Sequence, residues 1–218
     1  PTLQPEKVFN VEAMMLYKWL NVSVGYKYLK NVMGWTKYIY PGKEFAYSTS
    51  LNFDHKQLLY ASVYISPKFG IFRPTWGFNY NQQFFDTKKY GASKALSKPL
   101  LSCSLNNNFA LSETMNAAIR LNASTTHADG FLMMKSDYSV NLQFDKSFAN
   151  RTWIIYLSAD DIFKTAKERW TMYGLGAGTI KDCYNYSRNI SLQVTYNFNA
   201  KRSKYKGTGA GNEEKSRL

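Results

Sequence analysis

The sequence has no run of about 18 apolar residues, so it offers no helix of the kind that crosses a membrane. Cysteine is nearly absent. The only two, Cys103 and Cys183, are too few for a disulfide framework. We expect them to be a free pair, because they fall at different levels of the strands predicted below. These absences exclude helical membrane proteins and small disulfide-stapled domains.

Residues that carry chemistry are also sparse. The two histidines, His55 and His127, have no partner at ligand spacing, so no metal site is predicted. Asp160 and Asp161 could bind calcium or a substrate, although such a pair more often marks the point where a strand leaves the membrane. The glycines of 174–178 lack the G-x-G-x-x-G spacing of a phosphate loop. With no catalytic arrangement to assemble, we expect no enzyme and no cofactor.

The charge is one-sided, with 28 Lys and Arg against 15 Asp and Glu and a net charge of +13. The basic residues are spread over turns, loops and the tail rather than along one stripe, so a nucleic-acid partner is not expected. The chain opens Pro1-Thr2-Leu3-Gln4-Pro5, without Met and without a basic and apolar leader. We therefore expect a fragment of a longer exported protein.

What the sequence does have is aromatic residues and alternation. It contains 17 Tyr and 14 Phe, which suit strands and interfacial girdles. In residues 188–199 apolar and uncharged polar side chains alternate, and in a strand successive side chains point to opposite faces. About five apolar positions, with aromatics at one end, is what a strand crossing hydrocarbon needs. This segment predicts a membrane-spanning β-strand.

The rest of the chain repeats the pattern. We predict about nine strands, at 7–17, 21–40, 44–66 (with a bulge or loop at 54–56), 72–81, 99–111, 115–124, 134–144, 153–178 and 188–199. Short and long connections alternate, as in bacterial barrels with short periplasmic turns and longer external loops. The short ones are 18–20, 67–70, 112–114 and 145–150, and the long ones are 86–98, 125–130 and 179–187. Only the turn 41–43 is too short for an external loop. The prediction is an all-β, antiparallel transmembrane β-barrel.

Four segments carry a family resemblance: Asp-Ile-Phe-Lys-Thr at 161–165, the strand from Arg188 that ends Thr-Tyr-Asn-Phe-Asn at 195–199, the tail 204–218 and the turn 67–72. Together they resemble the C-terminal part of Bacteroidetes outer-membrane β-barrel proteins related to TonB-dependent receptors. The resemblance implies a barrel of about 22 strands, of which this chain would be the last nine.

The resemblance also implies organisation and partners. Residues 1–199 would be a partial barrel in the bacterial outer membrane, and residues 200–218 a basic, glycine-rich periplasmic tail. The partners would be outer-membrane lipid, the missing N-terminal strands and plug of the same protein, TonB and a surface lipoprotein. The function implied is uptake of a nutrient, such as a glycan or a siderophore, through a plugged lumen.

The polar face of the predicted strands is the candidate site. The side chains expected to line the lumen are Lys27, Arg73, Asn79, Asn81, Asn106, Arg120, Asn122, Lys135, Asp137, Asn141 and Gln143. The external-loop aromatics expected to touch cargo are Tyr90, Tyr184 and Tyr186. Two alternatives remain: a structural or surface-binding outer-membrane barrel without transport, and a soluble all-β binding protein such as a sandwich. The sandwich is less favoured, because its exposed face would usually carry charge rather than amides and hydroxyls.

Overall fold

The computed structural model describes residues 3–39, 42, 44–91, 95–184 and 186–198. This part of the chain is built from strands, with one turn of 3-10 helix, η1 (Lys88–Tyr90), and no α-helix. Within it, no helix has the length and apolar character that a membrane crossing requires. The strands are β1 (Lys7–Tyr17), β2 (Leu20–Ile39), β3 (Ala46–Ile65), β4 (Phe72–Phe84), β5 (Leu100–Ser112), β6 (Met115–Ser124), β7 (His127–Asp129), β8 (Leu132–Met134), β9 (Asp137–Phe148), β10 (Trp153–Asp160), β11 (Lys167–Tyr173), β12 (Gly178–Tyr184) and β13 (Asn189–Tyr196).

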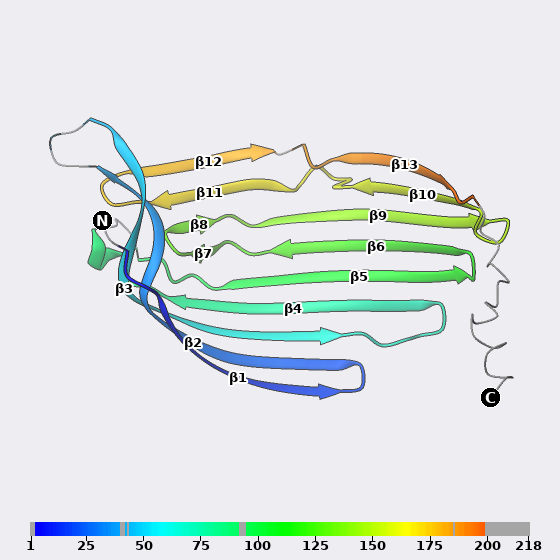
Figure 1. Cartoon of the computed structure of the whole chain (residues 1–218), viewed down its shortest axis with the longest axis horizontal. Coiled ribbons are helices and arrows are strands. Elements are labelled where there is room, and N and C mark those ends of the chain that lie inside the picture. The colour runs from blue at the N-terminus through cyan, green and yellow to red at the C-terminus, as the bar shows by residue number, and fades with distance from the viewer. Residues whose placement is uncertain (1–2, 40–41, 43, 92–94, 185, 199–218) are drawn as a thin grey trace, which may run out of the picture.

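Nine strands form a large curved sheet in the order β1-β2-β3-β4-β5-β6-β9-β10-β13, and every neighbouring pair is antiparallel (Figure 1). Tight turns join β1 to β2, β3 to β4, β5 to β6 and β9 to β10 at one end. The predicted all-β, antiparallel architecture is confirmed, and so are the short turns at 18–20, 67–70 and 112–114. The fourth short turn is present but lies at 149–152 rather than 145–150, because β9 continues to Phe148.

The register separates two faces across the whole large sheet. On one face Leu142 lies between Ile119 of β6 and Ala159 of β10. On the other, the hydroxyls of Ser23 and Ser62 lie 2.8 Å apart on neighbouring strands. Because the side-chain period of a strand is two residues, the alternation read from the sequence gives one apolar and one polar face wherever the strands pair in phase.

A second sheet of four short strands, in the order β12-β11-β8-β7, continues the large one. β7 follows β6, β8 precedes β9, β11 follows β10 and β12 precedes β13, so the small sheet repeats the order of the strands that it extends (Figure 1). The predicted single strand 153–178 is therefore wrong. It breaks at Asp161 and Lys164, which have positive φ angles of 44° and 58°. The predicted loops 125–130 and 179–187 contain β7 and most of β12.

The predicted strand count is also wrong, because the described residues form thirteen strands rather than about nine. The large sheet is not closed: among the described residues β1 and β13 are its edges. Neither closure nor a barrel of 22 strands is present in this structure. The turn expected at 41–43 lies outside the described residues except for Gly42, and the expected tail 200–218 lies wholly outside them.

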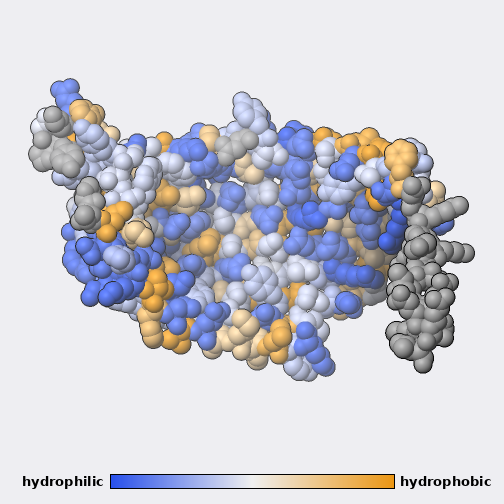
Figure 2. Space-filling model, in the orientation of Figure 1, coloured by the Kyte–Doolittle hydropathy of each residue, from blue (hydrophilic) through white to orange (hydrophobic). Residues whose placement is uncertain are grey.

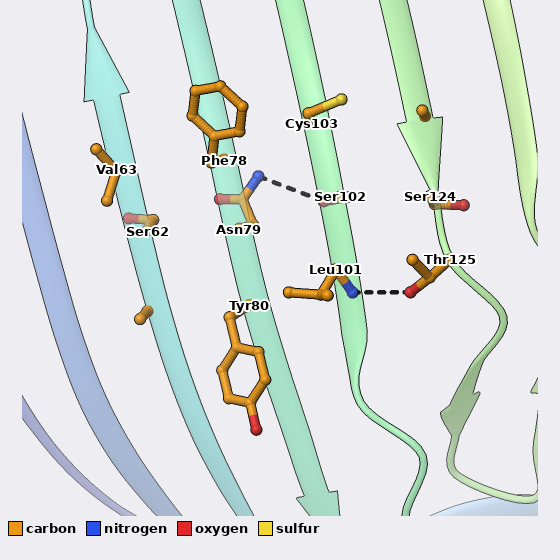
Figure 3. Close-up of a pocket in the computed structure, with 12 residues that line it drawn as sticks. Ser62, Val63, Phe78, Asn79, Tyr80, Leu101, Ser102, Cys103, Ser124 and Thr125 are labelled. Atoms are coloured by element: carbon orange, nitrogen blue, oxygen red, sulfur yellow. Dashed lines mark hydrogen bonds between the residues drawn. The ribbon is translucent and has the colours of Figure 1, made fainter.

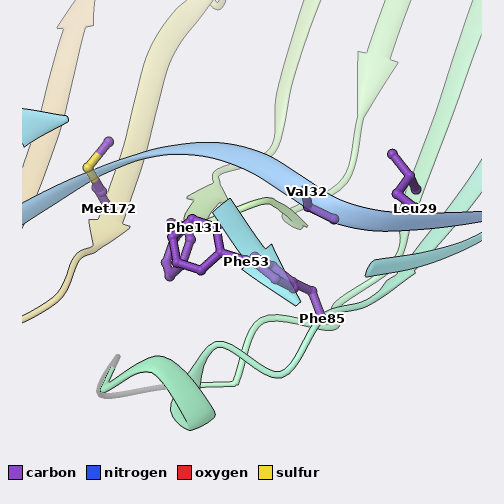
Figure 4. Packing of buried hydrophobic residues seen from close by; sticks show 6 residues of the cluster. All are labelled: Leu29, Val32, Phe53, Phe85, Phe131 and Met172. Atoms are coloured by element: carbon purple, nitrogen blue, oxygen red, sulfur yellow. The ribbon is translucent and has the colours of Figure 1, made fainter. Parts of the chain in front are cut away.

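The hairpin of β2 and β3 is longer than the other hairpins and bends across the polar side of the sheet (Figure 1). The irregularity expected at 54–56 is absent, since β3 is continuous there. It lies instead at Asn31 in β2, whose φ is 54°. Beyond that residue the hairpin packs over the small sheet, in a cluster that we call the cap (Figure 4). The cap consists of Leu29, Val32, Phe53, Phe85, Phe131 and Met172.

Aromatic rings hold the cap together. The ring centroid of Phe53 lies 4.8 Å from that of Phe131, 5.9 Å from that of Phe85 and 4.9 Å from that of Tyr90. These rings come from β3, from the connection after β4, from η1 and from the turn between β7 and β8. Aromatic pairs in this geometry contribute about 0.5–1.5 kcal/mol each beyond their buried area. The cap thus joins four segments that are distant in sequence.

Gly174→Ala is expected to detach the tip of the hairpin from the small sheet. The carbonyl oxygen of Lys37 accepts a hydrogen bond from the N–H of Leu175 at 2.7 Å. The N–H of Ile39 donates a hydrogen bond to the carbonyl oxygen of Leu175 at 3.3 Å. A Cβ on Gly174 would lie 2.7 Å from the carbonyl oxygen of Lys37 and would also clash with the carbonyl oxygen of Ala177. Both are backbone atoms, so the clash can be relieved only if the backbone shifts. Overpacking of this kind costs about 1–3 kcal/mol.

Amide hydrogen exchange measures this effect. Ile39 and Leu175 should exchange faster in the Gly174→Ala variant, while the amides of β4 and β5 keep their protection. Gly178→Ala is the control, because the closest atom to its added Cβ is the carbonyl oxygen of Met172 at 3.3 Å. Unchanged exchange at Ile39 and Leu175 would show that the hairpin tip does not depend on this contact.

Candidate functional site

The polar face of the large sheet holds ten of the eleven predicted lumen residues. It fills the middle of the space-filling view, where hydrophilic residues predominate (Figure 2). The cross-strand register brings Asn106, Arg120 and Asn141 into one row, and it places Asn122 opposite Ser139. The ten residues are Lys27, Arg73, Asn79, Asn81, Asn106, Arg120, Asn122, Asp137, Asn141 and Gln143.

Several of these side chains bind one another or a neighbour rather than facing open space. The Asn79 amide donates to Ser102 Oγ at 3.5 Å, and Ser124 Oγ donates to Asp137 Oδ1 at 2.7 Å. Asn141 Oδ1 accepts the backbone N–H of Asp161 at 2.7 Å. Part of the polar face is therefore a hydrogen-bonded lining that stabilises the sheet.

Lys135 is the exception among the predicted lumen residues. It lies between β8 and β9, outside the large sheet, and its backbone N–H donates to the carbonyl oxygen of Arg169 in β11 at 2.9 Å. The predicted strand 134–144 includes Lys135, because the alternation continues from the end of β8 into β9. Alternation alone does not reveal the break between them.

A hollow of about 280 Å³ opens on the polar face near the short turns. Its lining includes Arg73, Asn108, Asn116, Gln143 and Asp145. The Asn116 amide donates to Asp145 Oδ2 at 2.8 Å, whereas the buried Oε1 atom of Gln143 has no partner among the described residues. This mixture of amide, guanidinium and carboxylate groups suits an uncharged polar ligand with both donors and acceptors.

The three predicted cargo aromatics do not form one group. Tyr90 packs against the cap, and its phenolic oxygen accepts the backbone N–H of Asp54 at 2.5 Å. Tyr184 and Tyr186 do lie together, with ring centroids 6.0 Å apart. The side chain of Tyr186 is 89% exposed, so this residue remains available for contact.

Asp161 is the most connected polar side chain outside the sheet. It is 1% exposed, and its carboxylate accepts hydrogen bonds from the N–H of Thr165 at 2.8 Å, the N–H of Ala166 at 3.2 Å and Ser187 Oγ at 2.7 Å. It thereby ties the β10–β11 connection to the connection before β13. Burial would raise the pKa of Asp161, but the hydrogen bonds from Ser187, Thr165 and Ala166 outweigh it and hold the pKa below its ordinary value.

The sequence pattern singles out Asp161 but does not reveal this role. In the sequence, Asp161 marks the point where a strand is expected to leave the membrane, and it is the first residue of the Asp-Ile-Phe-Lys-Thr segment. A buried aspartate that accepts N–H groups four and five residues ahead is a recognisable turn device. The cap aromatics were missed altogether, although Phe85 and Phe131 each border a polar loop, which is an unusual place for a large apolar residue.

No disulfide bond joins Cys103 to Cys183. Cys103 lies on the apolar face between Phe78 of β4 and Ala123 of β6. It lines a shallow hollow of about 490 Å³ whose wall is almost wholly apolar (Figure 3). No group of three or more His, Cys, Asp and Glu side chains able to hold a metal ion occurs in the described part of the chain.

The match to a protein family agrees with this architecture. The sequence pattern of the outer membrane protein beta-barrel family matches residues 1–196. A similar solved structure is OmpT (in-vitro folded), an outer membrane protein of Vibrio cholerae, with 12% sequence identity and a TM-score of 0.49. The match covers 88% of this chain and 55% of that one, so the chain spans about half the length of the solved barrel. No curated protein matches the sequence.

Proposed function

Because this chain belongs to the outer membrane protein β-barrel family and resides in the bacterial outer membrane, we propose that it forms the wall of a barrel that acts structurally or binds at the cell surface, without catalysis and without an open pore. The cap is the observation that carries this proposal. It places an apolar cluster across the polar side of the sheet, at the end opposite the short turns.

The apolar face supports the membrane part of the proposal. Exposed apolar side chains lie on this face across the large sheet: Val24 in β2, Phe78 in β4, Leu142 in β9, Leu157 in β10 and Leu192 in β13. Such a continuous exposed apolar surface is far larger than a soluble protein tolerates, and in a barrel it meets lipid. Outer-membrane lipid is therefore the first partner of this protein.

The edges of the large sheet limit how the barrel can close. Every step from β1 to β13 is antiparallel and the sheet has nine strands, so the two edges run in the same direction. Joining them directly would create a parallel pair, and leaving them free would expose unpaired N–H and C=O groups to hydrocarbon. We infer that further strands pair with β1 and β13, as expected for part of a larger barrel.

Nutrient uptake of the TonB-dependent kind, with a plug, TonB and a surface lipoprotein as partners, is the second candidate. One observation favours it: the row that contains Asn106, Arg120 and Asn141 continues the polar face beyond the cap. An energised transporter would take up its nutrient only while the proton-motive force is maintained. A structural or surface-binding barrel would accumulate no nutrient in either state.

Liposome swelling tests the closed lumen. Protein extracted in mild detergent and reconstituted into liposomes should give no faster swelling in arabinose than empty liposomes. The double variant Phe53→Ala, Phe131→Ala removes the closest ring pair of the cap and should accelerate swelling several-fold. Phe69→Ala, at an exposed turn of the opposite end, is the matched control. Rapid swelling with the unaltered protein would overturn the proposal.

A further inference from the structure

A cleft of about 530 Å³ lies where the large sheet meets the small one. One wall is apolar and comes from Leu121 and Ala123 of β6 and Tyr138 of β9. Another wall carries three cationic side chains: Lys164, which precedes β11, and Lys167 and Arg169, which belong to β11. One cleft thus joins a hydrophobic surface to a concentration of positive charge.

The apolar wall belongs to the face that meets lipid. Leu121, Ala123 and Tyr138 share that face with Leu105 and Cys103, and Tyr138 is half exposed. Ala123 also lines the neighbouring hollow shown in Figure 3, where Phe78, Tyr80 and Leu101 border the smaller Cys103. Small side chains between large ones make a continuous apolar track that runs from the cleft along the sheet.

The cationic wall is held in place by identifiable contacts. Lys164 lies in the turn that Asp161 anchors, and its Nζ atom is 5.2 Å from the ring centroid of Tyr184. Arg169 Nη2 donates to the carbonyl oxygen of Ser136 at 2.6 Å. Two of the three positive charges are therefore positioned before any ligand arrives.

The charge of the cleft is not balanced by the protein. None of Lys164, Lys167 and Arg169 lies within 4.0 Å of a carboxylate oxygen in the part of the chain that the structure describes. Asp137 is the acidic residue in the lining, and its Oδ1 accepts a hydrogen bond from Ser124 Oγ at 2.7 Å. The neighbouring Glu168 forms an ion pair with Lys181 at 2.6 Å. Three cations thus face one carboxylate in the cleft.

From these contacts we propose that the cleft binds the phosphate of an anionic membrane lipid, whose acyl chains lie along the apolar track. The proposal rests on the proposed function, because it requires the apolar face to be embedded in lipid. Lysine and arginine near a membrane surface attract anionic headgroups, and arginine matches the geometry of phosphate oxygens. A ligand with both a phosphate and a hydrocarbon tail satisfies both walls of the cleft, whereas a free anion satisfies only one.

Electron spin resonance of spin-labelled lipids provides the test. The protein is reconstituted in phosphatidylcholine vesicles that contain either spin-labelled phosphatidic acid or spin-labelled phosphatidylcholine. Phosphatidic acid should be enriched at the protein by about tenfold. In the double variant Lys164→Gln, Lys167→Gln the two labels should associate almost equally. Lys88→Gln, Lys98→Gln removes two exposed charges from the same end, outside the cleft, and should preserve the enrichment.

The outcomes separate this proposal from the function on which it rests. A protein that inserts into the vesicles without preferring phosphatidic acid overturns the lipid site alone. A protein that fails to insert overturns the membrane assignment of the apolar face. Displacement of the labelled lipid by inorganic phosphate at millimolar concentration would identify the cleft as a free-anion site and also overturn the proposal. If the two double variants lost the enrichment of phosphatidic acid equally, the enrichment would come from the overall positive charge rather than from a site in the cleft.

Discussion

Leu142→Arg is expected to destabilise the inserted protein by about 2–4 kcal/mol, the cost of a cation on the lipid side of a barrel near the membrane midplane. Leu142 lies in the middle of β9, between Ile119 and Ala159, and is 40% exposed on the apolar face. In hydrocarbon an arginine at this position must either bend towards the headgroups or bring water with it. Urea unfolding of the protein in lipid vesicles, followed by tryptophan fluorescence, measures the change.

Asn122→Arg is the matched control for this prediction. Asn122 is an exposed residue on the polar face of the adjacent strand β6. An arginine there remains in the wet interior of the barrel, so the expected change is below about 1 kcal/mol. If Leu142→Arg and Asn122→Arg lowered the free energy of unfolding equally, the assignment of the two faces would be contradicted, and with it the membrane topology.

Asp161→Ala is expected to cost about 2–4 kcal/mol, because it leaves two backbone N–H groups and one hydroxyl without their buried acceptor. The loss should be local. The β10–β11 connection and the segment around Ser187 should lose protection in amide exchange, while β4 and β5 remain protected. Asp160→Ala, one residue earlier, removes a carboxylate that makes none of these contacts and should have little effect. Similar effects of the two substitutions would contradict the anchoring role.

The low pKa of Asp161 adds a pH dependence with a definite sign. Because the folded state holds the pKa below the ordinary value of 3.8, the folded protein favours the ionised form. The stabilisation is fully present above pH 3.8 and is lost as the pH falls through the lower folded value. The stability difference between the wild type and Asp161→Asn should therefore narrow below about pH 4. A constant difference down to pH 2 would contradict this linkage.

The two faces of the large sheet could be predicted from the sequence alone. In the segment 188–199 and in the strand through Leu142, the side-chain period of two residues determines which residues share a face, whatever the neighbouring strand is. For that reason ten of the eleven residues predicted to line the lumen share one face of the sheet, while their role in a lumen stays a prediction. The short turns at 67–70 and 112–114 were equally predictable, since proline, glycine and serine punctuate the alternation there.

Alternation could not reveal where a strand ends when the polar and apolar pattern continues past the break. The predicted strand 153–178 reads as continuous, yet Asp161 and Lys164 adopt positive φ angles that interrupt it. That interruption depends on hydrogen-bond partners from elsewhere in the chain: Asn141 of β9 and Ser187 of the connection before β13. The break is therefore a tertiary event, and it separates the small sheet from the large one.

By itself, then, the sequence determined an all-β chain with one apolar face and one amide-rich face, because both properties follow from local periodicity. Only the tertiary structure decided that Phe53, Phe85 and Phe131 meet in a cap and that Lys164, Lys167 and Arg169 face Leu121 and Tyr138. These groups come from segments separated by tens of residues. Their proximity depends on strand order and on where each hairpin bends, neither of which a repeating two-residue pattern encodes.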